Sequence, residues 1–475
     1  MPLFDPNQPL SWKKADAAQL RMLQSLQGNI LKGHGRPFAA LLFFQLRHAR
    51  QHEARRFLRH LANHHVTHAH EQLLGTERFK ANGQSAGPFV HVALSHAGYE
   101  ALGVEPNRIP RDPHFVDGMP QPGRVHDGSD RAGGQPEKPF PTGLHGVVLV
   151  ADDTAARCVA LAGEIGERAF KAHVHVVHVQ HGAGLFNAEG EGIEHFGYID
   201  GRSQPLMLAE DVEAENAKGG TSRWDAAFGP GIALVQEPGA DSYGSYLVFR
   251  KLEQDVRGFK LREQQLADAL QLKEAEHREL AGALLVGRFE DGTPVTLSDE
   301  ARGAAPPNDF DYRHDDQGAR CPFHAHIRKT NDRTAAARDI QMPRRGIPYE
   351  DVKREVHPEE LPEVDTLEAF KARVEQHLPT HGVGLLFMAY NAVIAKQFVA
   401  MQAGADNPNV PTAPGGPHGL DPVIGQGHPK KGDQKVTKTW DDPASGTEAF
   451  DFAGFVKLKG GEYFFSPSLD FLREL

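Results

Sequence analysis

The sequence predicts an α+β protein made of two ferredoxin-like domains. Three observations lead to this fold class. The first half of the chain orders its predicted elements as strand, helix, strand, strand, helix, strand, which is the order of a ferredoxin-like unit. The second half has strands and helices of the same style, without clear sequence identity to the first half. The length of 475 residues also suits two or three domains.

The elements of the first half follow from hydrophobic periodicity and from breaks rich in glycine and proline. Residues 172–179 alternate between apolar and polar side chains, which is typical of a half-buried strand. The segment 103–142 is dense in Gly, Pro and Asp and predicts a loop. We expect the sheet to carry helices on one face and to leave the other face free to cover something. In chain order, the predicted strands are 37–46, 88–94, 143–151 and 172–179, and the predicted helices are 49–60, 95–102 and 154–170.

The second half combines short strands with longer helices and longer loops. Loops as long as 287–360 and 407–443 usually carry function. We expect an N-terminal domain over 1–225 and a C-terminal domain over 226–475. In chain order, the predicted strands are 232–236, 245–251, 384–390 and 461–466, and the predicted helices are 254–272, 273–285, 366–377 and 392–402.

Composition excludes several classes of protein. With 52 basic and 63 acidic residues the net charge is −11, which gives no electrostatic footprint for nucleic acid or an anionic membrane. Two cysteines do not imply a disulfide framework. The first residues lack the pattern of a signal peptide, and no window approaches the ~18 apolar residues that span a bilayer. We therefore expect a cytoplasmic protein that binds neither nucleic acid nor membrane.

Asp200 lies between glycines in the segment Phe-Gly-Tyr-Ile-Asp-Gly at 196–201, which follows the last predicted strand of the first half. Glycines permit a sharp turn and a close approach to another group. An acid held in such a turn can therefore be aimed at a fixed point. Such a segment is more often only a turn, so the functional interpretation depends on what else the chain supplies.

A second cluster, Cys-Pro-Phe-His-Ala-His-Ile-Arg-Lys-Thr-Asn at 321–331, supplies candidate metal ligands. His324 and His326 would lie on one face of an extended strand, but would diverge in a turn or a helix. Histidine binds Zn, Cu and Fe, and it ligates haem iron through one ring nitrogen. The chain has 27 histidines, so the alternative is a histidine hydrogen-bonded within a loop.

Two further segments complete the candidate site. Arg344 and Arg345 precede a Gly-Ile-Pro turn, and their rigid forks of donors suit polarising a peroxide or holding a carboxylate; the alternative is a pair of surface salt bridges. The apolar run 382–391 predicts a core strand, in which Leu385 and Phe387 share one face. That face could also form the wall of a dry pocket for a flat cofactor.

Together these segments resemble the dye-decolourising peroxidase family. Gly-Tyr-Ile-Asp-Gly at 197–201 matches the Gly-x-x-Asp-Gly motif of the family. Residues 321–331 resemble its proximal-ligand segment, and 344–349 resemble its distal-arginine segment. The length and the inserted loops are similar to those of the longer, fungal-like members and their bacterial relatives. Further similar segments, which extend the resemblance to essentially the whole chain, are 26–31, 384–391 with Gln397 and Phe398, and 421–425.

The resemblance implies an enzyme, a haem peroxidase. Such an enzyme reduces hydrogen peroxide and oxidises dyes, phenols or other small aromatic one-electron donors through a ferryl-oxo porphyrin radical. The implied cofactor is haem b, iron protoporphyrin IX, bound between the sheet and the helices of the second domain. The alternative is a haem-binding, iron-handling protein of the deferrochelatase type. Two further alternatives agree less well with the combined motifs: a non-haem metal site on His324 and His326, and a protein without a cofactor.

The resemblance also assigns roles to residues. His326 would be the proximal iron ligand, although the family usually has a small residue where this chain has His324. Asp200 would move the proton of the peroxide, and an acidic pH optimum would follow because a carboxylate stays ionised where an imidazole base would be protonated. Arg344 would polarise the O–O bond, with Arg345 as its rival. The remaining expected cofactor contacts are Arg328, Gly201, Leu385 and Phe387, and weak candidates for a surface radical are Tyr246, Tyr390 and Trp440.

Overall fold

The computed structural model describes residues 3–119, 137–140, 143–219, 223–303, 308–354, 356–411, 413–427 and 430–475. The strands are β1 (Phe38–Gln45), β2 (Phe89–Leu94), β3 (Gly146–Asp152), β4 (His175–Ala183), β5 (Leu185–Phe186), β6 (Gly192–Ile193), β7 (Val235–Gln236), β8 (Tyr243–Gln254), β9 (Ile347–Glu350), β10 (Val383–Asn391), β11 (Lys435–Thr437), β12 (Thr447–Ala449) and β13 (Val456–Ser466). The helices are α1 (Ala17–Ser25), α2 (Gln51–His64), α3 (Ala69–Asn82), α4 (His96–Ala101), α5 (Pro113–Asp117), α6 (Ala155–Lys171), α7 (Ala209–Asn216), α8 (Val256–Ala269), α9 (Ala275–Val286), α10 (His326–Thr330), α11 (Ala335–Asp339), α12 (Leu367–Arg373), α13 (Ala400–Asp406) and α14 (Leu469–Glu474).

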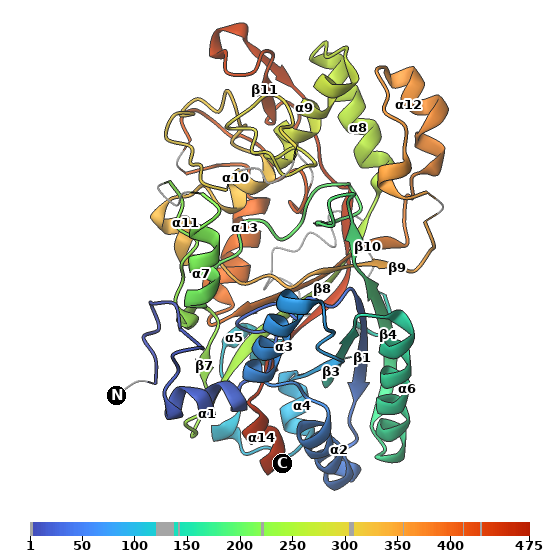
Figure 1. Ribbon diagram of the computed structural model, residues 1–475. Coiled ribbons are helices and arrows are strands. Elements are labelled where there is room, and N and C mark those ends of the chain that lie inside the picture. Colours follow the sequence, from blue (N-terminus) through green and yellow to red (C-terminus); the bar gives the residue numbers. More distant parts are fainter. Residues whose placement is uncertain are drawn as a thin grey trace.

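One nine-stranded antiparallel sheet organises the molecule (Figure 1). Its order is β4-β1-β3-β2-β13-β8-β10-β9, with β7 added to β8. Numbered within each half, both sets of four strands have the order 4-1-3-2, with helices between strands 1 and 2 and between strands 3 and 4 as in a ferredoxin-like unit. Short helices, α4 and α5 in the first half and α12 in the second, also lie between strands 2 and 3. The predicted α+β class of two ferredoxin-like units is therefore confirmed. The boundary between residues 225 and 226 stays a prediction.

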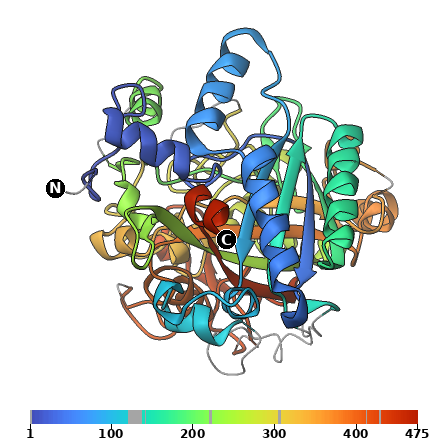
Figure 2. The same cartoon turned by 90° about the horizontal axis from the view of Figure 1, so that it is seen from below.

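Both faces of the sheet are apolar because both are covered. In β1, Ala39, Leu41 and Phe43 enter a core inside the curved sheet, whereas the alternate residues face helices α2 and α6. Seen from below, α2 and α6 lie against the strands of the first half, and α14 lies beside α2 (Figure 2). A third core lies between α8, α9 and the ends of the second-half strands. Within the described residues, no helix is long and apolar enough to cross a membrane.

The two halves of the sheet meet at a narrow join. Between β2 and β13 the ladder consists of the single pair Phe465↔Leu94. Gln27, which is fully buried, completes the join. Its amide donates to the carbonyl oxygens of Val92 and Pro467, at 2.8 and 2.7 Å, and accepts from the N–H of Val92 at 2.8 Å. Hydrogen bonds of the Gln27 side chain thus replace backbone pairing that is missing between β2 and β13.

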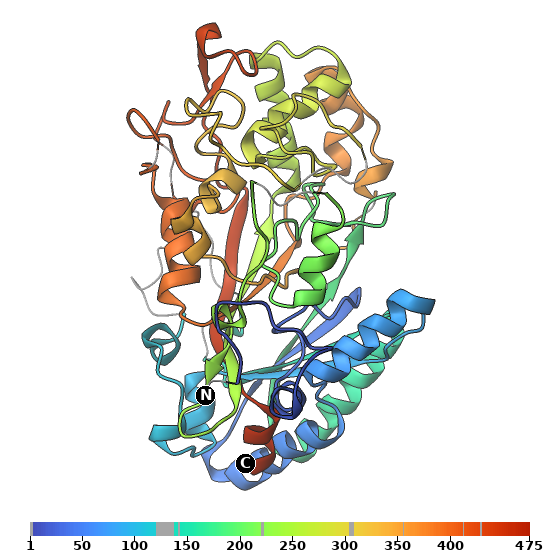
Figure 3. The ribbon, with the colours of Figure 1, turned by 60° about the vertical axis from the view of Figure 1, so that its left-hand side comes forward.

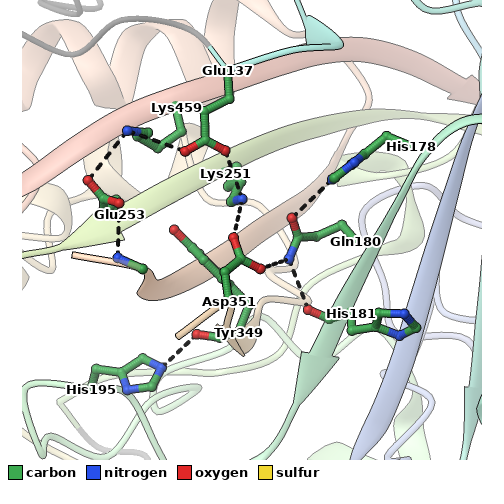
Figure 4. A network of polar contacts seen from close by, with 11 residues as sticks. Glu137, His178, Gln180, His181, His195, Lys251, Glu253, Tyr349, Asp351 and Lys459 are labelled. Atoms are coloured by element: carbon green, nitrogen blue, oxygen red, sulfur yellow. Dashed lines mark hydrogen bonds and ion pairs between the residues drawn. The ribbon is translucent and has the colours of Figure 1, made fainter. Parts of the chain in front are cut away.

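The outer edges of the sheet, β4 and β9, also contact each other, so the sheet curves into an open barrel. A polar network closes this seam (Figure 4). Lys251 points into the barrel with only 2% of its side chain exposed, and donates to Glu137 at 2.9 Å and Asp351 at 2.6 Å. Asp351, which follows β9, also accepts from Gln180 of β4 at 2.9 Å. The two edges are therefore joined through side chains.

The predicted elements of the first half are all present, within a few residues at their ends. Helices α1 and α3 were not expected, and part of the loop predicted at 103–142 lies outside the described residues. In the second half, β9 lies inside a segment predicted to be irregular. It has only four residues, including Pro348, and pairs with β10 alone on the path of the sheet, which is where a strand tolerates proline.

Candidate active site

A cavity of about 1720 Å³, a volume that includes its solvent-open mouth, lies on the outer face of the second-half sheet. Strands β8 and β10 form one wall, and helices α10 and α13, which lie side by side, contribute the opposite side (Figure 3). The structure brings together at this cavity all but one of the side chains that the sequence singled out as site residues. Those that line it are Asp200, Gly201, His326, Arg344, Leu385 and Phe387.

Asp200 is presented by a tightly bonded turn. Its exposed side chain lines the cavity, and its backbone N–H donates to the carbonyl of Gly192 at 2.9 Å. Gly197 has a φ of +101° and Gly201 one of +82°, values that side chains disfavour. At Gly197 an added Cβ would also approach the Glu290 carboxylate to 2.9 Å, whereas Gly201 faces open space. The two glycines therefore serve the turn itself.

The side chain of Glu194 stabilises this turn by accepting hydrogen bonds from its backbone. Its carboxylate accepts from the backbone N–H groups of Phe196 at 2.9 Å and Tyr198 at 3.1 Å, and from the Gln254 side chain. Its own N–H and C=O bond to Tyr198 and Gly197. Burial raises the pKa of Glu194 to about 7, against the effect of these donors. The sequence analysis did not single out this residue, whose only signal was an acid two positions before the motif.

His326 begins the short helix α10 and faces the cavity with a fixed ring orientation. Its Nδ1 lies 2.8 Å from Oδ2 of Asp421, which is fully buried. The other carboxylate oxygen, Oδ1, accepts from the N–H groups of Val423 and Ile424. With Nδ1–H donating to Asp421, the lone pair of the ring is on Nε2.

His326 and Asp421 shift each other's pKa in opposite directions, so that both charged forms are favoured. Burial alone would lower the pKa of His326, but Asp421 raises it above its ordinary value. Burial would likewise raise the pKa of Asp421, but His326 and the two N–H groups keep it below the ordinary value. Arg344 and Asp200 also act on His326 through charge, with opposite signs. The three groups are thus close enough to influence one another.

His324 is placed differently. It is buried, with 1% of its surface exposed, and does not line the cavity. Burial lowers its pKa to about 3, so the ring is neutral. Two positions apart and at the start of a helix, the two histidines diverge. Among the described residues no group of three or more His, Cys, Asp or Glu side chains is arranged to hold a metal ion.

The two neighbouring arginines also separate. Arg344 lines the cavity, and its Nη2 donates to the carbonyl of Arg202 at 3.0 Å, within the loop that follows Asp200. Burial lowers the pKa of Arg344 below its ordinary value, and Asp200 acts against that shift. Arg345 points away and donates to the carbonyls of Asn29 and Ile30. Arg345 thus holds the N-terminal segment at Asn29 and Ile30. Of these two arginines, only Arg344 is placed to act in the cavity.

Leu385 and Phe387 share one face of β10, as the sequence indicates, and both line the cavity. Phe387 packs near Phe398, with ring centroids 6.1 Å apart. Other apolar side chains complete the walls. They include Val286, Phe289, Met401, Val423 and Ile424.

Arg328 is the exception among the expected site residues. It does not line the cavity. Its guanidinium pairs with Asp315 at 2.7 Å and stacks on Tyr312 and Phe323. Two residues along helix α10 correspond to a rotation of about 200°, so Arg328 points away from the side that His326 faces. These contacts give Arg328 a structural role, and its expected contact with the cofactor stays a prediction.

The suggested surface radical residues are also placed differently. Tyr390 and Tyr246 are buried, with 0% and 4% of their surface exposed, so neither can contact a dye from solution. Trp440 is partly exposed and donates from its ring N–H to the carbonyl of Val295 at 2.9 Å. The sequence pattern of β8 and β10 predicts that the two tyrosines lie on strands, but it does not show which elements pack over them and bury them.

A family model described as the DyP dimeric alpha+beta barrel domain matches residues 25–184. The chain is 41% identical, over 99% of both proteins, to the multifunctional dye peroxidase DyP2 of Amycolatopsis sp.. It is 30% identical to the dye-decolorizing peroxidase msp1 of Mycetinis scorodonius, over 95% of this chain and 87% of that protein.

Solved structures agree with these similarities. The structure of DyP2 from Amycolatopsis sp. superposes with a TM-score of 0.88 and 39% identity, over 99% of this chain and 100% of that one. The DyP-type peroxidase of Anabaena sp. superposes with a TM-score of 0.85 and 33% identity, over 98% and 96% of the two chains. Both similarities extend over the whole sheet and the cavity.

Proposed function

The chain belongs to the dye-decolourising peroxidase family, and from this premise we propose that it is a haem peroxidase that reduces hydrogen peroxide and oxidises dyes, phenols or other one-electron donors. One observation carries the proposal. One cavity is lined by His326, whose Nδ1 bonds to the buried carboxylate of Asp421, by the exposed carboxylate of Asp200 and by the half-buried guanidinium of Arg344. These are an iron ligand, a proton acceptor and a fixed cation.

The residues present fit haem b as the cofactor. Nε2 of His326 is the one lone pair that the ring can offer to iron, and the Asp421 carboxylate makes that nitrogen more basic. The apolar side chains Leu385 and Phe387 suit the face of a porphyrin, and the turn at Gly201 leaves open space beside it. When bound, haem supplies the iron and the redox equivalents that cleave the O–O bond of the peroxide.

Asp200 moves the proton. Its carboxylate takes a proton from one oxygen of hydrogen peroxide and returns it to the other oxygen, which leaves as water. The turn makes this possible because it holds the carboxylate at the cavity without pairing it in an ion pair among the described residues. A carboxylate performs this step in mild acid, so we expect the pH–rate profile of dye oxidation to favour acidic pH.

Arg344 stabilises the negative charge that develops on the departing oxygen. A guanidinium fixed in a largely apolar cavity acts at low dielectric and needs no reorganisation during the reaction. Its hydrogen bond to the carbonyl of Arg202 ties it to the Asp200 loop. A second hydrogen bond, from the backbone N–H of Arg344 to the side-chain oxygen of Gln204 at 3.0 Å, joins it to the same loop.

Four variants test the proposal. Purified wild-type protein should contain haem, and His326→Ala should lose its Soret band whereas the matched control His324→Ala keeps it. Asp200→Asn should slow the reaction with hydrogen peroxide by ~10²- to 10⁴-fold. Arg344→Leu should slow it by ~10²- to 10³-fold.

The opposite pattern at the two histidines would assign the iron to His324 and refute the ligand proposed here. The iron-handling alternative has its own signature, because it leaves protoporphyrin after incubation, whereas the peroxidase leaves oxidised dye with haem intact.

A further inference from the structure

Besides Arg344, two further arginines, Arg288 and Arg333, line the cavity without an ion-pair partner among the described residues. Arg288 follows α9 and is buried, with 5% of its surface exposed. Arg333 follows α10 and is half-buried. Both line the cavity near the loop that follows Asp200, and the mechanism described above uses neither.

Only neutral groups bond to these guanidiniums. Arg288 donates to the carbonyl of Gly292 at 2.7 Å and to the side-chain oxygen of Asn308 at 2.8 Å. Arg333 donates to the Ser203 hydroxyl at 2.9 Å and to the carbonyl of Asn308 at 3.2 Å. The ring of Phe310 lies 5.0 Å from one guanidinium and 4.1 Å from the other. The cluster fixes both cations in place without an ion pair among the described residues, although the charges of Asp309 and Asp311 act on Arg333.

Arg202, which also lines the cavity, is paired with Glu191, and Arg328, which does not line it, is paired with Asp315. Burial lowers the pKa of Arg288 to about 9, and Arg333 beside it adds to the effect. Burial also lowers the pKa of Arg333 to about 10. Because an arginine is hard to deprotonate, two such groups at a cavity edge call for an anion from outside the chain.

We propose that Arg288 and Arg333 form an oxyanion site that binds a carboxylate or sulfonate group of a molecule held in the cavity. Their planar forks suit such a group, which they would bind through charge-assisted hydrogen bonds. The inference rests on the proposed function, because that function supplies two molecules with this chemistry. One is the propionate of haem, and the other is an anionic aromatic reductant.

The first experiment uses the full chain loaded with haem or with haem dimethyl ester, in which both propionates are uncharged. Loss of each haem to excess apomyoglobin is followed by absorbance. If a propionate is the ligand, Arg288→Gln and Arg333→Gln should each speed the loss of haem by about tenfold or more and leave the loss of the ester unchanged. The wild type should also lose the ester faster than haem, a comparison that needs no variant.

The second experiment uses the holoenzymes with a sulfonated dye and an uncharged phenol. If the reductant is the ligand, the two variants should raise KM for the dye by about tenfold, leave KM for the phenol unchanged and retain haem normally. Arg338→Gln is the matched control, because Arg338 on α11 donates to backbone carbonyls and does not line the cavity.

Two results would overturn the oxyanion site. One is unchanged haem loss together with unchanged KM for both reductants. The other is equally faster loss of haem and ester, which shows that the arginines only support the cavity wall. A protein that binds no haem in any form would instead refute the proposed function, so the two failures are distinguishable.

Discussion

Asp421 gives His326 one available nitrogen instead of two. The buried carboxylate accepts three hydrogen bonds, one from the ring and two from backbone N–H groups, so it stays charged and in place. A charged acceptor on Nδ1 pushes electron density toward Nε2. Iron bound there should therefore favour its oxidised form.

Asp421→Asn tests this effect. The amide can still accept from Nδ1, but it carries no charge, so we expect the reduction potential of the haem iron to rise and peroxidase turnover to fall by ~10- to 100-fold. Spectroelectrochemical titration gives the potential. Asp406→Asn is the matched control, because Asp406 bonds to Gln402 and Gln426 and does not contact His326. Equal shifts in both variants would show a general charge effect and not a ligand effect.

At the scale of residues, the sequence predicted the cavity-lining groups well where a motif carried them. Asp200, His326 and Arg344 were each named, and each lines the cavity. Arg328 was expected at the cofactor but does not line the cavity, because two residues along a helix point to nearly opposite sides and the sequence does not show which side of α10 faces the cavity. Arg288 was missed because nothing local marks an arginine whose partners are Ser203 and Asn308, distant along the chain.

At the scale of elements, the hydrogen bonds of Gln27 predict how much the join between the two halves contributes to the stability of the fold. Gln27→Ala would leave three buried backbone groups without partners, on Val92 and Pro467. We expect the free energy of unfolding to fall by ~3 kcal/mol, since each such group costs about 1–3 kcal/mol and the costs are not additive. Urea denaturation measures it. Gln236→Ala, at an exposed position, should change the stability by less than ~0.5 kcal/mol.

The Lys251 network predicts an asymmetry between partners. Lys251→Met removes a buried ammonium and leaves Glu137 and Asp351 with 37% and 45% of their side chains exposed, where water can solvate them. Asp351→Ala instead leaves the buried ammonium with one partner fewer. We expect Asp351→Ala to lower the melting temperature more than Lys251→Met does. A larger effect of Lys251→Met would show that the ion pair itself stabilises the seam.

The sequence predicted most helices and strands, but it did not predict that the two edges of the sheet, β4 and β9, meet. Hydrophobic periodicity located β1, β8 and β10, because burial on a sheet leaves a local pattern. The short strand β9 left no such pattern, and the contact of β4 with β9 depends on residues about 170 positions apart. Long-range pairing of this kind has no local signal.

At the scale of the whole molecule, stability should have a maximum in mildly acidic solution. Burial raises the pKa of Glu194 and Glu462 to about 7, so their contribution is fully present below about pH 4.5 and is lost as pH rises through 7. Burial lowers the pKa of His34 and His91 to about 3, so their contribution is lost as pH falls below about 6.5.

The melting temperature measured from pH 4 to 9 checks this. We expect a decline on both sides of a maximum near pH 6, and Glu462→Gln should flatten the alkaline side, where the carboxylate of that residue would cost up to ~3 kcal/mol. A melting temperature that keeps rising from pH 6.5 to 8.5 would contradict the assignment of the two glutamates.

The position of β8 in the sheet has a consequence for how the protein is made. The four strands of the first half all lie between residues 38 and 183, so that half can complete its ladders early in synthesis. β8 ends at residue 254, but its main neighbours are β10 and β13, at 383–391 and 456–466. A growing chain therefore carries the 12 residues of β8, nearly all of them buried in the finished fold, with most of both edges unpaired while more than a hundred further residues are translated. Slow translation, low temperature and chaperones that shield strand edges should decide the soluble yield of this protein more than the stability of the finished fold.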